Sequence, residues 1–478
     1  MKRQVDVAIV GAGTAGLNAR REAEKAGRSW VLIDEGPLGT TCARIGCMPS
    51  KLLIAAADAA HMARRAPSFG VAIDGADVRV DGPAVLRRVR AERDRFTSLV
   101  VDGVEKLPAE QVLRGRARFV GPGELEVDGY GRVQAKAVVI ATGSRPALPP
   151  PFDAIAKDVL TSDALFELPD LPSDVAVIGT GIIGLELGQA LHRLDVKTTF
   201  FNPFDHVGLF SDPAVDRVVR RVLGAELDLK LGTSIELATP QSDGVHLTWR
   251  NPDGSAESLT FSAVLVAAGR RSDVASLDLE RAGVQLDDGG RPPWDAATTQ
   301  VASLPIFIAG DASGHRPLLH EASDEGRIAG RNAASWPDVR AAQRRLGLAI
   351  AFTSPQMAVV GRKYSDLDAE DICVGEIDYA NQGRARVMLE NAGRVRLYAE
   401  RKSCRLVGAE MFGPRVEHMA HSVAWIMQQG LKAQDALSLP FYHPVFEEGL
   451  RTALRSLVEG LKVAGGCPPE DFAESPGS

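Results

Sequence analysis

The chain has 478 residues and a formal net charge of -7, with no long run of basic residues. That length suffices for about three domains, and the charge argues against nucleic acid or an anionic membrane as a partner. No stretch reaches the roughly 18 apolar residues of a membrane span, and the N-terminal apolar run is too short for a secretory signal. We therefore expect a cytoplasmic protein.

The first predicted element is a short apolar strand, 5–10, which leads directly into a glycine loop. Gly11, Gly13 and Gly16 form the pattern GxGxxG, and a helix-like stretch follows. Such a loop lets the backbone turn tightly and approach a dinucleotide pyrophosphate at a helix N-terminus. Asp34 lies 18 residues beyond Gly16, at the end of a second strand, where a carboxylate is suited to accept a ribose hydroxyl.

Two cysteines five residues apart, Cys42 and Cys47, follow this second strand. On a regular helix five residues advance about 7.5 Å, beyond the roughly 4.4–6.8 Å between Cα atoms that a disulfide tolerates. A bridge therefore needs an irregular turn, which Gly46 permits and Pro49 at a helix start would help to define. Taken alone, the pair is equally well interpreted as two buried thiols, whereas no neighbouring cysteine or histidine cluster supports a metal site. The odd total of five cysteines favours ordinary thiols in a reducing compartment for Cys373, Cys404 and Cys467.

The strand and glycine loop recur after residues 175–178. Here the glycines are Gly179, Gly181 and Gly184, and Asn202 lies 18 residues beyond the last of them, as Asp34 does in the first copy. Asn202 can hydrogen-bond a 2′-hydroxyl, and no arginine cluster follows it to bind a 2′-phosphate. We therefore favour NAD for this loop, with NADP as the open alternative.

Further apolar runs end in small residues or a carboxylate at 137–143, 263–270 and 306–311. After residue 344 strand-like runs (387–389, 395–399 and 406–411) are followed by a helical stretch, 417–429. The pattern predicts an α/β protein with two Rossmann-like dinucleotide-binding domains and a C-terminal α+β domain. We expect the boundaries to be 1–150 and 276–344 for the first domain, 151–275 for the second, 345–465 for the terminal domain and 466–478 for a tail.

In this order the motifs resemble those of the flavin-dependent pyridine nucleotide–disulfide oxidoreductases, and most of all the dihydrolipoamide dehydrogenases among them. The resemblance runs from about residue 5 to 457, and its other motifs are 42–51, 141–143, 267–270, Gly310-Asp311 and the HPVFEE segment at 443–448. It implies FAD at the first glycine loop, NAD at the second and a homodimer formed through the terminal domain.

The resemblance also assigns catalytic roles. Cys47 would face the flavin as a thiolate, and Cys42 would exchange with the substrate sulfur. His443 of the partner subunit would move protons at Cys42, oriented by Glu448. Lys51 and Glu186 would form a pair between the flavin and the nicotinamide.

Cofactor contacts follow in the same way. The residues expected at FAD are Gly11, Gly13, Gly16, Asp34, Thr41, Lys51, Ala117, Thr142, Gly143, Asp311 and His320. Those expected at NAD are Gly179, Gly181, Gly184, Glu186, Asn202 and Gly269.

The resemblance predicts an enzyme that passes electrons between dihydrolipoamide or lipoamide and NAD, with a lipoyl-carrying protein as its partner. The alternatives are a reductase of another disulfide or electrophile, such as a glutathione-like one, a flavin transhydrogenase, and a flavoprotein that only senses NADH. A mercuric reductase is disfavoured because Cys467 stands alone near the C-terminus. Three departures from the family pattern surround the substrate side: Thr40 replaces a usual glycine, Arg44 lies between the cysteines, and Arg21 matches a substrate-contacting arginine of glutathione-type relatives.

Overall fold

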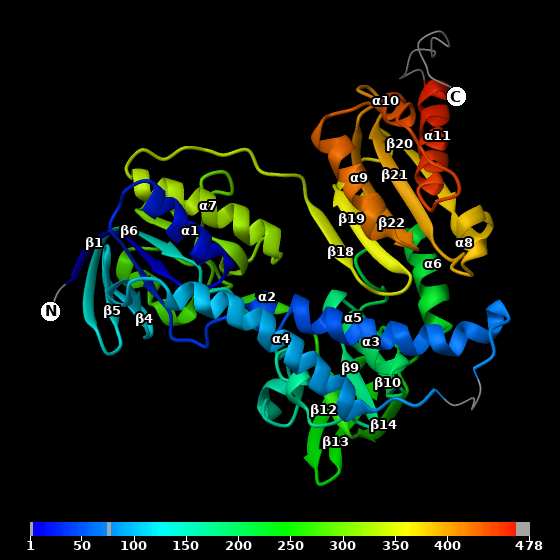
Figure 1. The fold of residues 1–478 in the computed structure, drawn as a ribbon, viewed down its shortest axis with the longest axis horizontal. Helices are drawn as coiled ribbons and strands as arrows, with labels where there is room; N and C mark the ends of the chain where they lie inside the picture. Colours follow the sequence, from blue (N-terminus) through cyan, green and yellow to red (C-terminus); the bar gives the residue numbers. More distant parts are fainter. Residues whose placement is uncertain (1–2, 74–77, 465–478) are drawn as a thin grey trace.

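The computed structural model describes residues 3–73 and 78–464, so the predicted tail at 466–478 lies outside the described residues. Figure 1 shows three bodies, each built around a sheet. None of the helices in the described ranges has the length and apolar character that a membrane span requires.

The first sheet has the strand order β3-β2-β1-β6-β5-β4, and β17 pairs with β6. The pairs β1–β2, β1–β6 and β17–β6 are parallel, so the later segment that contains β17 returns to the sheet begun by the N-terminus. Helices α1 (Thr14–Lys25) and α7 (Leu319–Ser335) pack side by side on one face (Figure 1). The strands are β1 (Arg3–Val10), β2 (Trp30–Ile33), β3 (Val112–Leu113), β4 (Ala117–Gly121), β5 (Glu124–Val127), β6 (Gly131–Ile140) and β17 (Ile306–Ile308).

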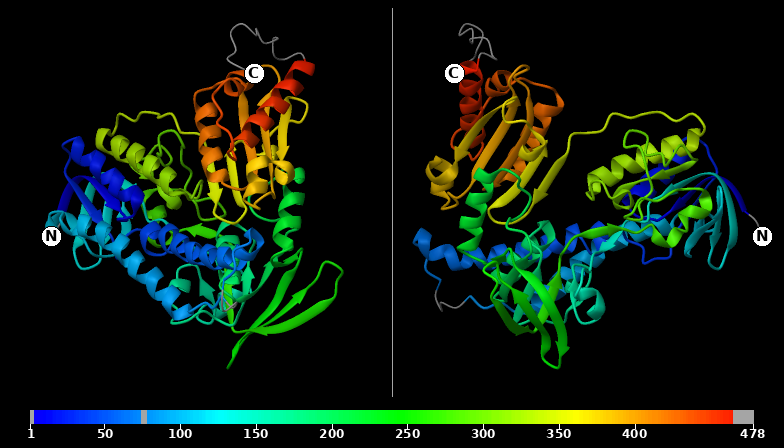
Figure 2. Two further views of the ribbon diagram at one scale, coloured as in Figure 1. Left: turned by 45° about the vertical axis from the view of Figure 1, so that its right-hand side comes forward. Right: turned by 180° about the vertical axis from the view of Figure 1, so that it is seen from behind.

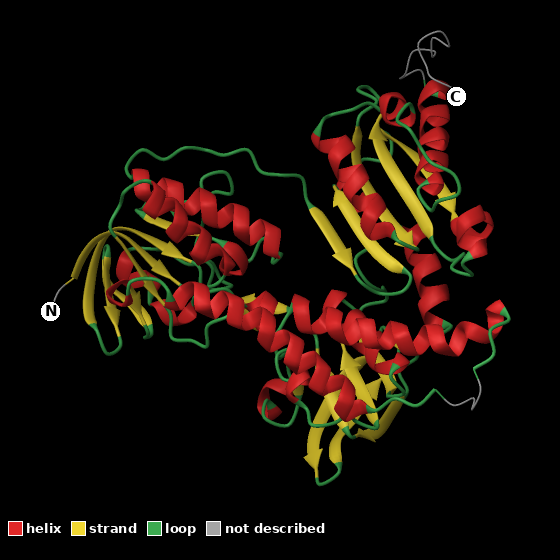
Figure 3. Ribbon diagram, viewed as in Figure 1, coloured by secondary structure: helices red, strands yellow, loops and turns green. Residues whose placement is uncertain are grey.

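The second sheet is parallel throughout, in the order β11-β10-β9-β15-β8, and a three-stranded antiparallel sheet, β12-β13-β14, accompanies it. Two long helices lie between β2 and β3 in the sequence, α3 (Cys47–Arg65) and α4 (Gly82–Glu105), and Figure 3 shows them extending from the first sheet toward the second. A short ribbon, β7 with β16, joins the two parts. The other bounds are β7 (Ser144–Pro146), β8 (Leu160–Thr161), β9 (Asp174–Ile178), α5 (Ile182–Arg193), β10 (Lys197–Asn202), α6 (Pro213–Gly224), β11 (Asp228–Leu231), β12 (Ser234–Gln241), β13 (Gly244–Arg250), β14 (Ala256–Phe261), β15 (Ala263–Val266) and β16 (Arg270–Ser272).

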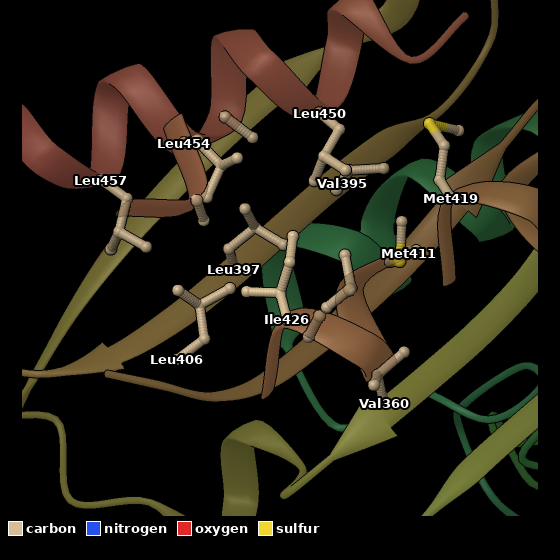
Figure 4. Close-up of a cluster of buried hydrophobic side chains, with 14 of the residues drawn as sticks. Val360, Val395, Leu397, Leu406, Met411, Met419, Ile426, Leu450, Leu454 and Leu457 are labelled. Carbon is tan, nitrogen blue, oxygen red and sulfur yellow. The ribbon is translucent and has the colours of Figure 1, made fainter. Parts of the chain in front are cut away.

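The terminal sheet is antiparallel, in the order β18-β19-β22-β21-β20, and a long extended segment connects α7 to it (Figure 2). In Figure 4, Leu450, Leu454 and Leu457 of α11 lie over Val395 and Leu397 of the sheet, and all five are buried. Their helical spacing gives α11 one continuous apolar stripe. The elements are β18 (Leu348–Ala351), β19 (Gln356–Gly361), β20 (Ile372–Asp378), α8 (Gly383–Val387), β21 (Arg394–Glu400), β22 (Leu406–Gly413), α9 (Val416–Gln428), α10 (Ala433–Leu437) and α11 (Glu448–Val463).

The predicted fold class is confirmed, but two local predictions are wrong. Residues 387–389 form no strand, because Gln382 caps α8 by accepting the Ala385 N–H at 2.7 Å, and Leu389 then has a positive φ of 54°. Cys404 is disulfide-bonded and is not the ordinary thiol that the sequence predicts. Cys373 is a buried free thiol as expected. Cys467, the third of the cysteines predicted to be ordinary thiols, lies outside the described residues.

Candidate active site

The two glycine loops have the same geometry, each at the carboxyl end of a central parallel strand. Gly11 has φ +108° and Gly179 has φ +107°, conformations that side chains rarely adopt. A Cβ on Gly11 would overlap the carbonyl oxygen of Ala141, and one on Gly179 would lie 2.6 Å from that of Ala267. Each loop opens a helix, α1 or α5, that has no acidic residue in its first turn. The free N–H groups of these two helix ends therefore favour an anionic ligand such as a phosphate.

A cavity of about 1450 Å³ joins the two loops. Gly13 and Gly181, the residues that precede α1 and α5, line it, and Cys42, Cys47 and Lys51 lie on its wall between them. Neither glycine has a neighbouring atom closer than 4.0 Å to the position of an added Cβ, so the space in front of both loops is open. The volume exceeds the roughly 300–1,000 Å³ of an ordinary small-molecule pocket, as a site shared by two cofactors requires.

Several of the residues predicted to hold FAD surround the first loop. The Thr142 hydroxyl is buried, has no hydrogen-bond partner within the described part of the chain and does not line the cavity, although its neighbours Ala141 and Gly143 do. Ala117 does not join this group, because it lies in β4 within the core of the first sheet, away from the described cavity wall. The predicted residues that do line the cavity are Gly13, Thr41, Lys51, Gly143, Asp311 and His320.

Asp34 fastens the end of β2 to the first loop. Its Oδ2 accepts the Ala12 N–H at 2.6 Å, and its Oδ1 accepts the Gly36 N–H at 2.6 Å. Each oxygen keeps a lone pair, so a ribose hydroxyl stays a predicted partner. Gly16 and Gly184 lie inside the turns, where a Cβ would overlap the carbonyl of the first glycine of the same loop.

Asn202 is buried at the end of β10 and organises the second loop. Its Nδ2 donates to the Thr180 hydroxyl at 2.6 Å and to the His206 carbonyl at 2.9 Å, so both amide hydrogens are used within the chain. Its Oδ1 accepts the Phe204 N–H at 3.3 Å and is the only atom left for a ribose hydroxyl. The predicted NAD residues that line the cavity are Gly179, Gly181, Glu186, Asn202 and Gly269.

The two cysteines lie on either side of a helix break. Cys42 belongs to α2 (Thr41–Arg44), and Cys47 is the first residue of α3, with Gly46 before it, so the irregular turn expected from their spacing is present. Both are free thiols; Cys42 is half-buried and Cys47 is exposed. A hydrogen bond from Cys42, helped by the positive charge of Lys51, lowers the pKa of Cys47 to about 7.

The same interaction has the opposite effect on the other thiol. Because Cys42 donates to Cys47 and is partly buried, the pKa of Cys42 is raised above its ordinary range. Cys47 is therefore the sulfur of the pair that ionises near neutral pH, whereas Cys42 stays a protonated thiol. This asymmetry gives the two sulfur atoms different chemistry.

Lys51 is held beside the cysteines from two directions. Its Nζ donates to Glu186 Oε2 at 2.7 Å and lies 4.5 Å from the centre of the Phe352 ring. The other oxygen of Glu186 accepts the Phe352 N–H at 2.8 Å, and the Glu186 side chain is buried. The ion pair thus joins the helix of Cys47 to the helix that follows the second loop, with Phe352 of the terminal part as its support.

His443 and Glu448 form a pair outside this cavity. His443 Nδ1 lies 2.8 Å from Glu448 Oε1, and Glu448 Oε2 accepts the Val445 N–H at 3.2 Å. The carboxylate fixes the ring and leaves Nε2 to exchange protons. The His443 side chain is 79% exposed and is not among the described residues that line the cavity with Cys42. Within one chain, therefore, this base does not meet the thiols.

The three residues that depart from the family pattern, Thr40, Arg44 and Arg21, do not all line a cavity. Arg44 lines neither this cavity nor the smaller one beside Cys42, and its Nε is buried without a described partner. Arg21 does line the smaller cavity. Thr40 lines it too, in a strained backbone conformation (φ 59°, ψ 150°), and its hydroxyl accepts the Ala43 N–H at 3.4 Å.

Sequence reasoning missed the residues that support the cofactor loops from a distance. Glu325, fully buried in α7, accepts the Gly310 N–H at 2.7 Å, and Arg344 donates to its other oxygen at 2.8 Å. Sequence reasoning missed Phe352, which supports the Lys51–Glu186 pair, as well. A glutamate in an amphipathic helix and a phenylalanine in a loop carry no pattern that distinguishes them from surface or core residues.

The family model described as pyridine nucleotide-disulphide oxidoreductase matches residues 5–326, and that of its dimerisation domain matches 348–454. Dihydrolipoyl dehydrogenases from Halobacterium salinarum and Bacillus subtilis are each 31% identical; the alignments cover 94% and 96% of this chain and 95% and 99% of those proteins.

Two solved structures share the fold. LpdA from Mycobacterium tuberculosis has a TM-score of 0.80 at 24% identity, over 95% of this chain and 99% of that one. The HOCl-induced flavoprotein disulfide reductase RclA from Escherichia coli has a TM-score of 0.79 at 24% identity, over 94% and 99%. At this identity the likeness concerns the fold alone.

Proposed function

Since the chain belongs to the pyridine nucleotide-disulphide oxidoreductase family, we propose that it oxidises a dithiol of the dihydrolipoamide type and reduces NAD⁺, through Cys42 and Cys47. As a member of this family it is a flavoprotein that uses FAD and NAD(H), and its terminal domain is a dimerisation domain. The substrate and the residue roles are our proposal.

The observation that carries the proposal is the unequal pair of thiols in one cavity with both glycine loops. Cys42 and Cys47 line the cavity between Gly13 and Gly181, and their pKa values are shifted in opposite directions. FAD, bound at the first loop, supplies two-electron exchange between the nicotinamide and the cysteine pair. A cavity open to both loops gives the two cofactors a common meeting point beside the thiols.

We assign each sulfur one task. In the oxidised enzyme a substrate thiolate attacks Cys42 of the Cys42–Cys47 disulfide, and Cys47 leaves as the thiolate that its lowered pKa stabilises. The second substrate thiolate then attacks the mixed disulfide at the substrate sulfur and releases Cys42. The substrate loses two electrons and two protons, and the enzyme pair gains the two electrons.

Proton transfer needs a base near Cys42. His443 of the partner subunit accepts the proton from the substrate thiol and returns one to Cys42, with Glu448 stabilising the cationic ring. The proton of the other substrate thiol is released to solvent. On reoxidation the proton on Cys42 and the two electrons of the pair account for the hydride that NAD⁺ would receive, so the reaction balances. The lipoyl group would be presented by a carrier protein, because the relatives are dihydrolipoyl dehydrogenases.

Anaerobic titration of the oxidised holoenzyme with dihydrolipoamide tests the proposal. We expect reduction of the Cys42–Cys47 disulfide, seen as a long-wavelength absorption band from the Cys47 thiolate next to the oxidised flavin. In a Cys42→Ser variant NADH should still reduce the flavin, whereas dihydrolipoamide should cause no spectral change. If dihydrolipoamide produces no long-wavelength band in the wild type while NADH does reduce the enzyme, the proposed substrate is wrong.

A further inference from the structure

A buried carboxylate of the terminal domain binds the segment that precedes α6 in the second domain. Glu410 of β22 is fully buried, and no basic side chain within the described ranges pairs with it. Its Oε2 accepts the Ser211 and Asp212 N–H groups, each at 2.9 Å, and its Oε1 accepts the Ser211 hydroxyl at 2.6 Å and the Tyr364 N–H at 3.0 Å. These four hydrogen bonds satisfy the carboxylate without a cation, and any change of the side chain would leave buried donors unpaired.

The neighbouring carboxylate, Asp212, ties the same segment to the next strand of the terminal sheet. Asp212 is fully buried and caps α6 by accepting the Ala214 N–H at 2.8 Å. It also accepts from Arg396 Nη1 at 2.6 Å and from the Tyr398 hydroxyl at 2.9 Å. Since these two donors belong to β21 and Glu410 to β22, two adjacent strands bind the start of α6, which lies beside them (Figure 1).

The other end of this segment binds the second glycine loop. The Gly208 N–H donates to the Thr180 carbonyl at 2.8 Å, and the Thr180 hydroxyl donates to the His206 carbonyl at 3.2 Å. Thr180 is buried and is the second residue of the GxGxxG pattern, and Gly208 lines the large cavity. The 206–212 segment therefore connects the nucleotide loop directly to Glu410.

Apolar packing against the terminal sheet accompanies these hydrogen bonds. Gly208 has φ +77°, and a Cβ there would lie 2.6 Å from the sulfur of Met357 in β19. Phe210 is buried, and its ring centre lies 6.4 Å from that of Phe412 in β22. Such contacts are not directional, whereas hydrogen bonds are, so Glu410 fixes where along the sheet the segment lies.

We infer that Glu410 is a positioning residue for the nicotinamide nucleotide: it fixes the 206–212 segment, and that segment holds the second glycine loop in its phosphate-binding conformation. The loop and the N-terminus of α5 bind a phosphate best when their N–H groups converge, and the Gly208–Thr180 hydrogen bond maintains that arrangement. Glu410 itself does not line the cavity. The inference rests on the proposed function, in which NAD binds at this loop, and adds that the terminal domain controls the affinity.

The test measures the Kd of NAD⁺ for the oxidised holoenzyme by isothermal titration calorimetry. Glu410→Gln keeps the shape of the side chain but places an amide N–H opposite buried donors, so we expect the Kd to rise about tenfold. Ser211→Ala removes one of the four donors, and its Kd should rise about threefold. Glu376→Gln is the matched control, because Glu376 is an exposed carboxylate of β20 in the same sheet and pairs with Arg396 at 3.1 Å; its Kd should stay that of the wild type.

A second readout separates positioning from general damage to the fold. Reduction of the Cys42–Cys47 disulfide by dihydrolipoamide needs no NAD, so the rate at which the long-wavelength band appears should be unchanged in all three variants, as should the FAD content per chain. The inference is wrong if the Kd is unchanged in Glu410→Gln and Ser211→Ala, if it rises equally in Glu376→Gln, or if the dithiol step slows and FAD is lost in proportion.

Two further outcomes keep the inference apart from the proposed substrate. If Glu410→Gln does not fold, Ser211→Ala decides, because it retains the carboxylate and its three backbone partners. If dihydrolipoamide gives no band even in the wild type, the proposed substrate is wrong, and the Kd series together with the FAD content still decides the role of Glu410.

Discussion

Replacing Cys42 with alanine would reveal what keeps Cys47 ionised. The largest cause of the lowered pKa of Cys47 is the hydrogen bond that it accepts from the Cys42 thiol, followed, among the favourable causes, by the charge of Lys51. Alanine removes the donor and leaves Lys51 with its partner Glu186 in position. Burial, which raises the pKa of Cys47, is then opposed mainly by the charge of Lys51, so the pKa should rise toward its ordinary value of 9.0.

The size of the expected change follows from the thiolate fraction of Cys47 at the two pKa values. With a pKa of about 7, Cys47 is about half thiolate at pH 7, whereas with a pKa of 9.0 only about 1% would be thiolate. Because the pKa is lowered in the folded protein, the thiolate is present above the midpoint and lost as the pH falls through it. Loss of the Cys42 donor should shift the titration curve of the Cys47 thiol to higher pH and reduce its thiolate fraction at pH 7 severalfold.

The assay is alkylation of the reduced holoenzyme by iodoacetamide between pH 5 and pH 10, with mass spectrometry to follow the peptide that contains Cys47. Only the thiolate reacts, so the rate traces its titration. Cys373→Ala, which removes a buried free thiol of the terminal domain, is the control and should leave the midpoint near 7. A midpoint that stays near 7 in Cys42→Ala would refute the assignment of the hydrogen bond as the main cause.

Three further predictions concern the supports of the site. Arg344→Met leaves the buried Glu325 carboxylate without its cation, so urea unfolding of the holoenzyme should show a free energy of unfolding lower by about 3–5 kcal/mol. Arg345→Met, which removes a more exposed pair, should lower it by less than about 1 kcal/mol, and equal losses in the two variants would contradict the role of burial. His443→Gln should lower dihydrolipoamide oxidation at least about 100-fold and leave flavin reduction by NADH unchanged in stopped flow; undiminished turnover would rule out the proposed base. NADH should reduce the flavin faster than NADPH, since no arginine cluster follows β10, and equal rates would overturn the NAD preference.

Much of the fold was predictable from the sequence because its signals are local. A glycine loop between an apolar strand and a helix requires a positive φ at its first position, and Gly11 and Gly179 both have one. The cysteine spacing demanded a helix break, and the break lies at Gly46. The run at 387–389 misled because Val387 ends α8, and the capping of that helix by Gln382, five residues earlier, decides the local structure.

The parts that could not be predicted depend on residues far apart in the sequence. Arg44 lies between the cysteines in the sequence, yet it lines neither cavity, whereas Arg21 of α1 lines the smaller one. Lys51 and Phe352 are 301 positions apart, and only the packing of the terminal part against α3 brings them together. No periodicity or spacing encodes such a contact.

The separation of His443 from the thiols of its own chain has a consequence for mixed dimers. A Cys42→Ala chain and a His443→Gln chain are each inactive alone, but they carry complementary defects. A twofold dimer contains two equivalent sites. If His443 of each chain serves the Cys42 of the opposite chain, a dimer of one Cys42→Ala chain and one His443→Gln chain has one site that carries both substitutions and one site that carries neither. Mixing the two inactive proteins under conditions that exchange subunits should therefore restore up to half of the wild-type activity per mixed dimer. A base that served its own chain would give no recovery.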